Sequence, residues 1–330
     1  MHMADALLSP AVGATMYAAS AAAAVYSVKK VKEDFEPKKV PLMGVMGAFV
    51  FAAQMINFSI PGTGSSGHIC GGILLAALLG PYAAFLTMIA ILLIQCLLFA
   101  DGGILALGCN IWNMAFYACF FGFFCIYKPF IKNGMSRVKL IIACVLGCVL
   151  SLQLGAFSVV LETTISGITE LPFSVFVATM QPIHLAIGAV EGLVTAAVLI
   201  FIYQTRPELL NSEATQNKFS FKKVIVIMAI IVALVGGAVS LFASSNPDGL
   251  EWSMEQVAGT TELEADGGVH DTLANVQEKT AVLPDYSFGN DNVTGTSFSG
   301  IVGSALVAGL CILLSVIFGI YRKKKAKSEK

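Results

Sequence analysis

Apolar runs and polar breaks alternate along almost the whole chain. Most of the apolar runs approach the roughly 18 to 20 residues that an α-helix needs to cross a hydrocarbon core. Short segments rich in charge, proline or glycine separate them. The alternation predicts an all-α integral membrane helix bundle whose spans lie near residues 10–28, 41–60, 69–80, 82–99, 104–127, 139–162, 173–204, 223–243 and 300–321.

The third predicted span, residues 69–80, has the length expected of a re-entrant or buried segment, so charge must decide whether it crosses. If all nine segments cross and the N-terminus lies outside, the cytoplasmic segments hold 19 of the 20 Lys and Arg residues. Because positive residues concentrate in cytoplasmic loops, this arrangement is favoured, with Gly80-Pro81 as the turn after the third span. We therefore expect a multi-pass protein of a bacterial inner membrane, with its C-terminus in the cytoplasm.

Composition agrees with lipid as the solvent, since 56% of the residues are hydrophobic and only 12% are charged. Soluble globular proteins carry roughly a quarter charged residues. No GxxxxGK[ST] phosphate-binding loop occurs in the sequence, so no ATPase activity of its own is expected. The basic C-terminal tail, residues 322–330, fits an anchor near anionic lipid and not a nucleic-acid site.

One long polar segment, residues 243–300, interrupts the apolar pattern near the C-terminus. It holds ten acidic residues and a single lysine, Lys279. The segment is expected to be a weakly structured extracytoplasmic loop, and His270 within it an ordinary solvated histidine. An alternative is that the negative charge concentrates cations near a binding site.

Two of the four histidines lie where a metal site could form. His2 adjoins the chain terminus, and His68 lies in a glycine-rich outward loop. An amino-terminal Xaa-His can offer the amine of Met1, the deprotonated amide of His2 and the His2 imidazole to one ion, with His68 as fourth ligand. Four nitrogens in a square suit Ni(II) or Cu(II). An apolar run followed by lysines is the reverse of a secretory signal, so no cleaved leader is expected. Because His2 is bulky, we expect removal of Met1 to be inefficient and its amine to remain in place. Either histidine alone would carry little weight.

Ionisable residues inside predicted spans are candidates for function because their burial in lipid is unfavourable. His184 and Glu191 are seven residues apart and so share one helical face. An interhelical hydrogen-bonding role is favoured for this pair, and support of the metal ligands or an ion path is the alternative. The other polar residues that could support the ligands are Asp5, Asn57, Asp101 and Asn110.

Residues 1–205 resemble the CbiM/NikM family, the membrane substrate-binding components of energy-coupling factor transporters for cobalt and nickel. The resemblance lies in Met1-His2 with Ala4-Asp5-Ala6-Leu7-Leu8-Ser9-Pro10, in Gly64-Ser-Ser-Gly-His68, in Gln95-Cys-Leu-Leu-Phe-Ala-Asp-Gly-Gly103, and in Leu107-Gly-Cys-Asn110. Residues 223–330 resemble the accessory subunit CbiN/NikN through Asn246-Pro-Asp-Gly-Leu-Glu-Trp252, after a cytoplasmic linker at 206–222.

The resemblance implies a seven-span metal-binding core fused to two further spans. It also implies nitrogen ligands from Met1, His2 and His68, and partners comprising a transmembrane coupling (T) component and cytoplasmic ABC ATPases. The expected function is capture of Ni(II) or Co(II), with nickel favoured, by a transporter subunit that needs no cofactor. Cobalt uptake for cobalamin synthesis, a membrane enzyme using His184 and Glu191, and an accessory protein that binds no ion are the alternatives.

Overall fold

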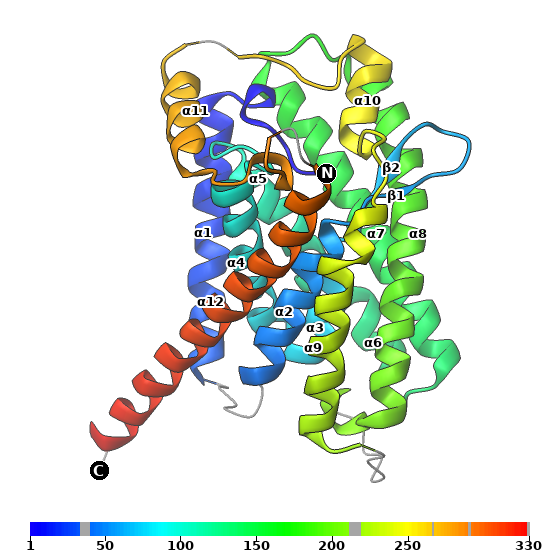
Figure 1. The fold of residues 1–330 in the computed structure, drawn as a ribbon, viewed down its shortest axis with the longest axis vertical. Helices are drawn as coiled ribbons and strands as arrows, with labels where there is room; N and C mark the ends of the chain where they lie inside the picture. Colours follow the sequence, from blue (N-terminus) through cyan, green and yellow to red (C-terminus); the bar gives the residue numbers. More distant parts are fainter. Residues whose placement is uncertain (34–39, 211–218, 266, 290–291, 329–330) are drawn as a thin grey trace.

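The computed structural model describes residues 1–33, 40–210, 219–265, 267–289 and 292–328, without the side chains of residues 292–293 and of those after Tyr321. Long helices run side by side along the major axis, with the N-terminus near one end and the C-terminus at the other (Figure 1). Within these ranges seven helical segments are long and apolar enough to cross a membrane. The predicted all-α membrane helix bundle is therefore confirmed, while the count of nine crossings stays a prediction. The seven segments are α1 (Pro10–Glu33), α4 (Pro81–Phe99), the helix Leu107–Ile131, α7 (Arg137–Ser166), α8 (Phe173–Thr205), Phe221–Phe242 and Thr294–Tyr321.

Several of these segments are composite. Leu107–Ile131 joins α5 (Leu107–Asn110) and α6 (Lys128–Ile131) through a π-helical stretch. The C-terminal pair comprises α9 (Phe221–Gly237), which continues into a short 3₁₀ turn, and α12 (Asn292–Ser328). A further 3₁₀ turn, Pro207–Leu210, opens the predicted linker, of which residues 211–218 lie outside the described part.

The two predicted spans after α1 are shorter than expected. Helix α2 (Val40–Gln54) has 15 residues, and α3 (Gly72–Leu79) has only eight. Between them the chain forms an antiparallel hairpin of β1 (Phe58–Ser59) and β2 (Ser66–Gly67). It then returns into the bundle as extended backbone up to Gly71, which has a left-handed φ of 81° that favours glycine. The predicted helix over 69–80 is thus wrong at its start.

The extended stretch before α3 brings peptide groups into the interior, where no water can satisfy them. Glu191 of α8 solves this problem, because its two carboxylate oxygens accept hydrogen bonds from Cys70 N at 3.0 Å and Gly71 N at 2.8 Å. The segment that carries His68 is thereby fixed to a long helix.

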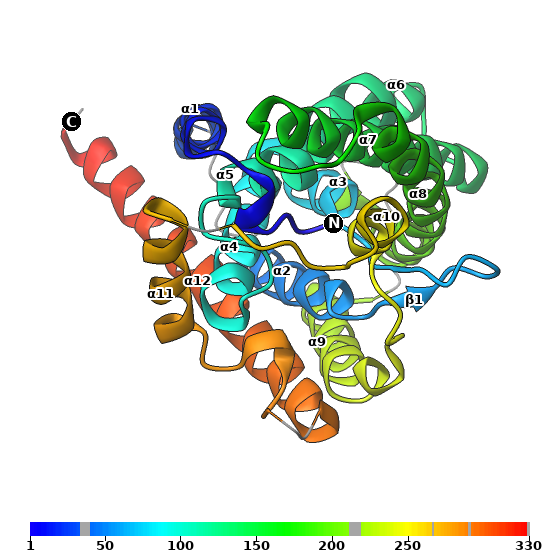
Figure 2. The ribbon, with the colours of Figure 1, turned by 90° about the horizontal axis from the view of Figure 1, so that it is seen from above.

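Residues 243–265 and 267–289 form a folded cap and not a weakly structured loop, so that expectation is wrong. The cap contains α10 (Gly249–Ala258), α11 (Val269–Thr280) and a 3₁₀ turn, Pro284–Tyr286. Seen from above, α10 and α11 lie on opposite sides of the N-terminus (Figure 2). Asp266 and Asp291, two of the ten acidic residues, lie outside the described part.

Several hydrogen bonds tie the cap to the core. Ser66 N donates to Pro247 O at 2.8 Å, and Leu283 N to Leu98 O at 3.1 Å. Gln277 Nε2 donates to the carbonyls of Cys96 at 3.0 Å and Gly102 at 2.8 Å. His270 Nε2 lies 2.9 Å from Leu8 O, so this histidine is bound and not simply solvated as expected.

Helices α7 and α8 make the most extensive helix pair of the bundle. Glycines one turn apart on α8 permit this, because a Cβ atom at Gly188 or Gly192 would lie 2.9 or 2.4 Å from the Cα atoms of Val149 and Val145. Small residues that allow close backbone approach are a common basis of helix association in membranes.

We expect Gly192→Ala to lower the stability of the purified protein by about 1–3 kcal/mol, because the added methyl group overpacks the α7–α8 contact. The measurement is thermal unfolding in detergent. Gly309→Ala in α12, where no heavy atom lies within 4 Å of the new Cβ, is the matched control and should leave the melting temperature unchanged. Equal melting temperatures for the two variants would contradict the prediction.

Candidate metal centre

The N-terminal segment enters the bundle and is held there by polar side chains. Asn110 clamps Met3 from both sides, since its Oδ1 accepts from Met3 N at 2.8 Å and its Nδ2 donates to Met3 O at 3.2 Å. Asp5 Oδ1 accepts from Ala106 N at 3.0 Å. Asn110 and Asp5, both expected to support the ligands, thus fix the path of the chain end. Met1 itself is 4% exposed.

The structure brings the three predicted ligands together. The Met1 amine nitrogen lies 3.0 Å from His68 Nε2, although the residues are 67 positions apart in sequence. The rings of His2 and His68 stack with centroids 5.2 Å apart and planes inclined by 19°. The three residues reach this point from the N-terminal segment and from the extended stretch after β2.

The His2 ring has partners on both nitrogens in this conformation. Its Nδ1 lies 3.0 Å from Asp101 Oδ1, and its Nε2 lies 3.2 Å from Gln95 Oε1. The Tyr286 hydroxyl of the cap donates to the other oxygen of Asp101. Because Nδ1 is the nitrogen that closes a chelate ring with the backbone, chelation through His2 requires its ring to leave Asp101.

Asp248 is the residue that sequence reasoning missed as a partner of the site, because it appeared there only as one acidic residue of a long loop and as part of the Asn246–Trp252 motif. Its Oδ2 lies 2.5 Å from the Met1 amine and 3.9 Å from His68 Nε2. Its Oδ1 caps α10 by accepting from Leu250 N at 2.8 Å and Glu251 N at 3.0 Å, so the side chain is held in place. Asp followed three residues later by Glu was the available signal for this cap.

Burial and the ion pair shape the protonation of the site. Burial, and then the Met1 ammonium, lower the pKa of His2 and of His68 to about 3, so both imidazoles are neutral. Burial alone would raise the pKa of Asp248, but the charge of the Met1 ammonium holds it well below its ordinary value. Burial would lower the pKa of the Met1 amine, but Asp248 reverses this and raises it.

The remaining candidates lie around this centre in different roles. Glu191 accepts hydrogen bonds from the backbone next to His68 and so helps to fix the position of this predicted ligand. His184 does not make the expected interhelical bond: its Nδ1 contacts Met180 O of its own helix at 2.7 Å, and its Nε2 has no hydrogen-bond partner among the described residues. Asn57 lines the cavity above the site and accepts from Ser244 N of the cap through its backbone oxygen at 2.7 Å.

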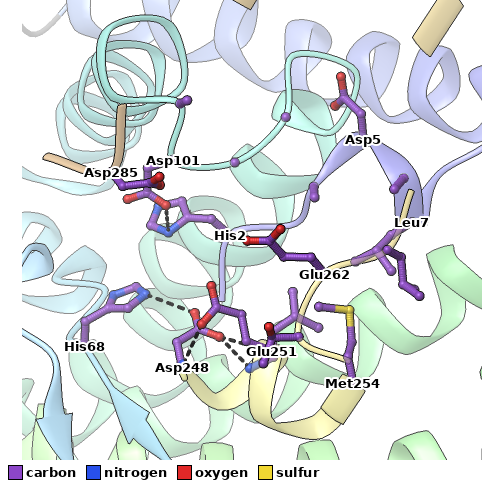
Figure 3. A pocket seen from close by; sticks show the side chains of 18 of the residues that line it. His2, Asp5, Leu7, His68, Asp101, Asp248, Glu251, Met254, Glu262 and Asp285 are labelled. Atoms are coloured by element: carbon purple, nitrogen blue, oxygen red, sulfur yellow. Dashed lines mark hydrogen bonds and ion pairs between the residues drawn. The ribbon is translucent and has the colours of Figure 1, made fainter. Parts of the chain in front are cut away.

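A cavity of about 450 Å³ lies above the site between the core and the cap. Figure 3 shows His2, His68, Asp101 and Asp248 directed into it. Within the described ranges, no three side chains of His, Cys, Asp or Glu are grouped closely enough to hold a metal ion by themselves. A metal centre here therefore needs main-chain nitrogen, which the Met1 amine provides. The carboxylates that line the cavity are Asp5, Asp101, Asp248, Glu251, Glu262 and Asp285.

The chain is similar to known transport proteins over almost its whole length. It is 34% identical, over 96% of its residues and 98% of the relative, to a putative fused nickel transport protein NikMN of Archaeoglobus fulgidus. It is 32% identical to a probable fused nickel transport protein LarMN of Lactiplantibacillus plantarum, with 78% and 79% of the two chains covered. The crystal structure of a truncated transition metal transporter superposes with a TM-score of 0.55 at 33% identity, covering 62% of this chain and 99% of that one.

These relatives are named as transport proteins and not as enzymes, in agreement with the expectation from sequence. Residues 222–319 match the PDGLE domain, named for the sequence Pro247-Asp-Gly-Leu-Glu251 that contains Asp248. Residues 2–209 match CbiM, the cobalt uptake substrate-specific transmembrane region, and the chain therefore belongs to the CbiM family.

Proposed function

We propose that the protein captures Ni(II) or Co(II) at the extracytoplasmic face and delivers it inward as the substrate-binding subunit of an energy-coupling factor importer. The single observation that carries this proposal is the buried contact between the Met1 amine and His68 Nε2 at 3.0 Å. The ion is the transported substrate. The proposal takes Met1 as the free start of the chain.

The geometry of this contact fits two neighbouring ligands of one ion. Two nitrogens at about 2 Å from a metal and at right angles to each other lie about 2.8 Å apart. The backbone nitrogen and the turned imidazole of His2 would complete a square of four nitrogens. A nitrogen square suits Ni(II), and its rigid shape, not the raw affinity of its ligands, is what separates similar ions.

Two features support nickel as the preferred substrate and a multi-subunit importer as the setting. The relatives that share both the core and the fused C-terminal segment are named nickel transport proteins. Because the sequence holds no phosphate-binding loop, energy would come from ABC ATPases through a transmembrane coupling component. Co(II) is the alternative substrate.

Adding one residue before Met1 should abolish a yellow, low-spin Ni(II) absorption band of the purified protein, because it removes the amine from its chelate ring. His68→Ala should abolish the band as well. His270→Asn, which alters a histidine of the cap remote from these nitrogens, is the control and should retain the band. Unchanged nickel absorption after N-terminal extension would end the terminal-chelate proposal.

Glu191→Gln should weaken Ni(II) binding by about 10- to 100-fold, the usual effect of losing a group that orients a ligand. Glutamine keeps the volume but can accept only one of the two backbone hydrogen bonds from Cys70 and Gly71, so His68 loses its fixed position. Equilibrium competition with a chelator measures the change. Glu262→Gln, which changes the same charge on the cavity wall, should bind as the unchanged protein does.

Ni(II) affinity should rise with pH by at least about tenfold per unit up to about pH 8, because the ion must displace a proton from the amine. The reason is that Asp248 raises the pKa of the Met1 amine, so the metal-free site holds an ammonium at neutral pH. The two histidines do not add to the pH dependence of the Ni(II) affinity in this range, since their pKa values are about 3. Titrations at several pH values test this, and a flat profile would exclude the amine as a ligand.

A further inference from the structure

Three donor atoms at the centre form a nearly right-angled triangle. The Met1 amine lies 2.5 Å from Asp248 Oδ2 and 3.0 Å from His68 Nε2, and the last two atoms are 3.9 Å apart. The square of the longest side nearly equals the sum of the squares of the other two, so the right angle is at the amine. The midpoint between Asp248 Oδ2 and His68 Nε2 is therefore equally far from all three atoms.

An ion at that midpoint would lie about 2 Å from each of the three atoms, within the range of metal–nitrogen and metal–carboxylate bonds. Asp248 and His68 would be opposite each other, with the amine between them, as in a square or octahedral complex. In the all-nitrogen square of the proposed function, the position opposite His68 belongs to the backbone nitrogen of His2. Asp248 Oδ2 thus occupies the place that this nitrogen would take.

We propose that Asp248 is a metal ligand in a loading complex, in which the amine, His68 and the carboxylate hold the ion before the nitrogen square forms. This inference rests on the proposed function. As the ion binds, the Met1 ammonium would release one proton to water so that its nitrogen can coordinate. In the following step the bond from Asp248 to the metal would break, the His2 amide would release its proton to water, and its nitrogen would take the vacated position.

The structure equips Asp248 for this role in two ways. Its other carboxylate oxygen is engaged by the backbone of α10, which leaves Oδ2 free to face the site. Because α10 belongs to the cap, the fused C-terminal segment would supply a ligand that the core lacks. A carboxylate ligand also needs no deprotonation of a backbone amide, so the ion can bind before that slow step.

The competing explanation is a plain ion pair, in which the Met1 ammonium donates to both acceptors and Asp248 has no part in metal binding. The two explanations differ in the kinetics of loading. A loading complex of two nitrogens, one oxygen and water is expected to be six-coordinate and paramagnetic, and the nitrogen square of Ni(II) diamagnetic and yellow.

The experiment mixes the full-length purified protein rapidly with Ni(II) alone and follows the yellow absorption and the magnetic susceptibility. Asp248→Asn and Asp248→Ser keep an N-cap for α10, since both residues cap helices well, but remove the charged ligand. The unchanged protein should form a paramagnetic species before the yellow one. In both variants the paramagnetic species should be lost. The yellow complex should form at least about tenfold more slowly, and its final spectrum should be unchanged.

Glu262→Gln is the matched control, because it removes one negative charge from the wall of the same cavity. If the yellow complex formed equally slowly in Glu262→Gln and Asp248→Asn, Asp248 would act only by general electrostatic attraction, and the inference would be overturned. Loading of both Asp248 variants at the unchanged rate would overturn it as well. Absence of any yellow complex in the unchanged protein would instead refute the proposed function itself, so the two failures are distinguishable.

Discussion

The arrangement of this molecule depends on the burial of a charged chain end inside a membrane bundle. An ammonium group in such surroundings must have partners, because uncompensated burial of a charge is strongly unfavourable. Met1 finds them in Asp248 and His68, which come from the cap and from the extended stretch before α3. The chain end therefore joins three parts of the structure that are distant in sequence.

Each of these three parts is fixed by a further polar contact. Asn110 holds the N-terminal segment through Met3, Glu191 holds the extended stretch through two peptide groups, and the backbone of α10 holds Asp248. In all three contacts a side chain bonds to main-chain atoms that no regular helix or strand pairs. Irregular backbone is tolerated where surrounding protein satisfies its polar groups, and here it forms the candidate metal centre.

The fused C-terminal segment is more than a pair of additional helices. Its cap bonds to the core through Leu283, Gln277, His270 and Pro247, and it contributes the carboxylate next to the chain end. The acidic character of residues 243–300 alone gave no hint of this structure, because a similar composition is common in solvated linkers. Capping of α10 by Asp248 converts part of that segment into an ordered wall of the cavity.

The sequence by itself determined the helices. In a membrane, the N–H and C=O groups of a long apolar run must form hydrogen bonds within the segment, and an α-helix achieves this. The sequence also singled out Met1, His2 and His68, through chemistry that depends only on adjacency to the terminus and on residue type. Tertiary structure alone decided where α3 begins, how Glu191 is used, and that Asp248 reaches an amine 247 positions away. Such contacts arise from packing between segments, and the local pattern around each residue carries no record of its distant partner.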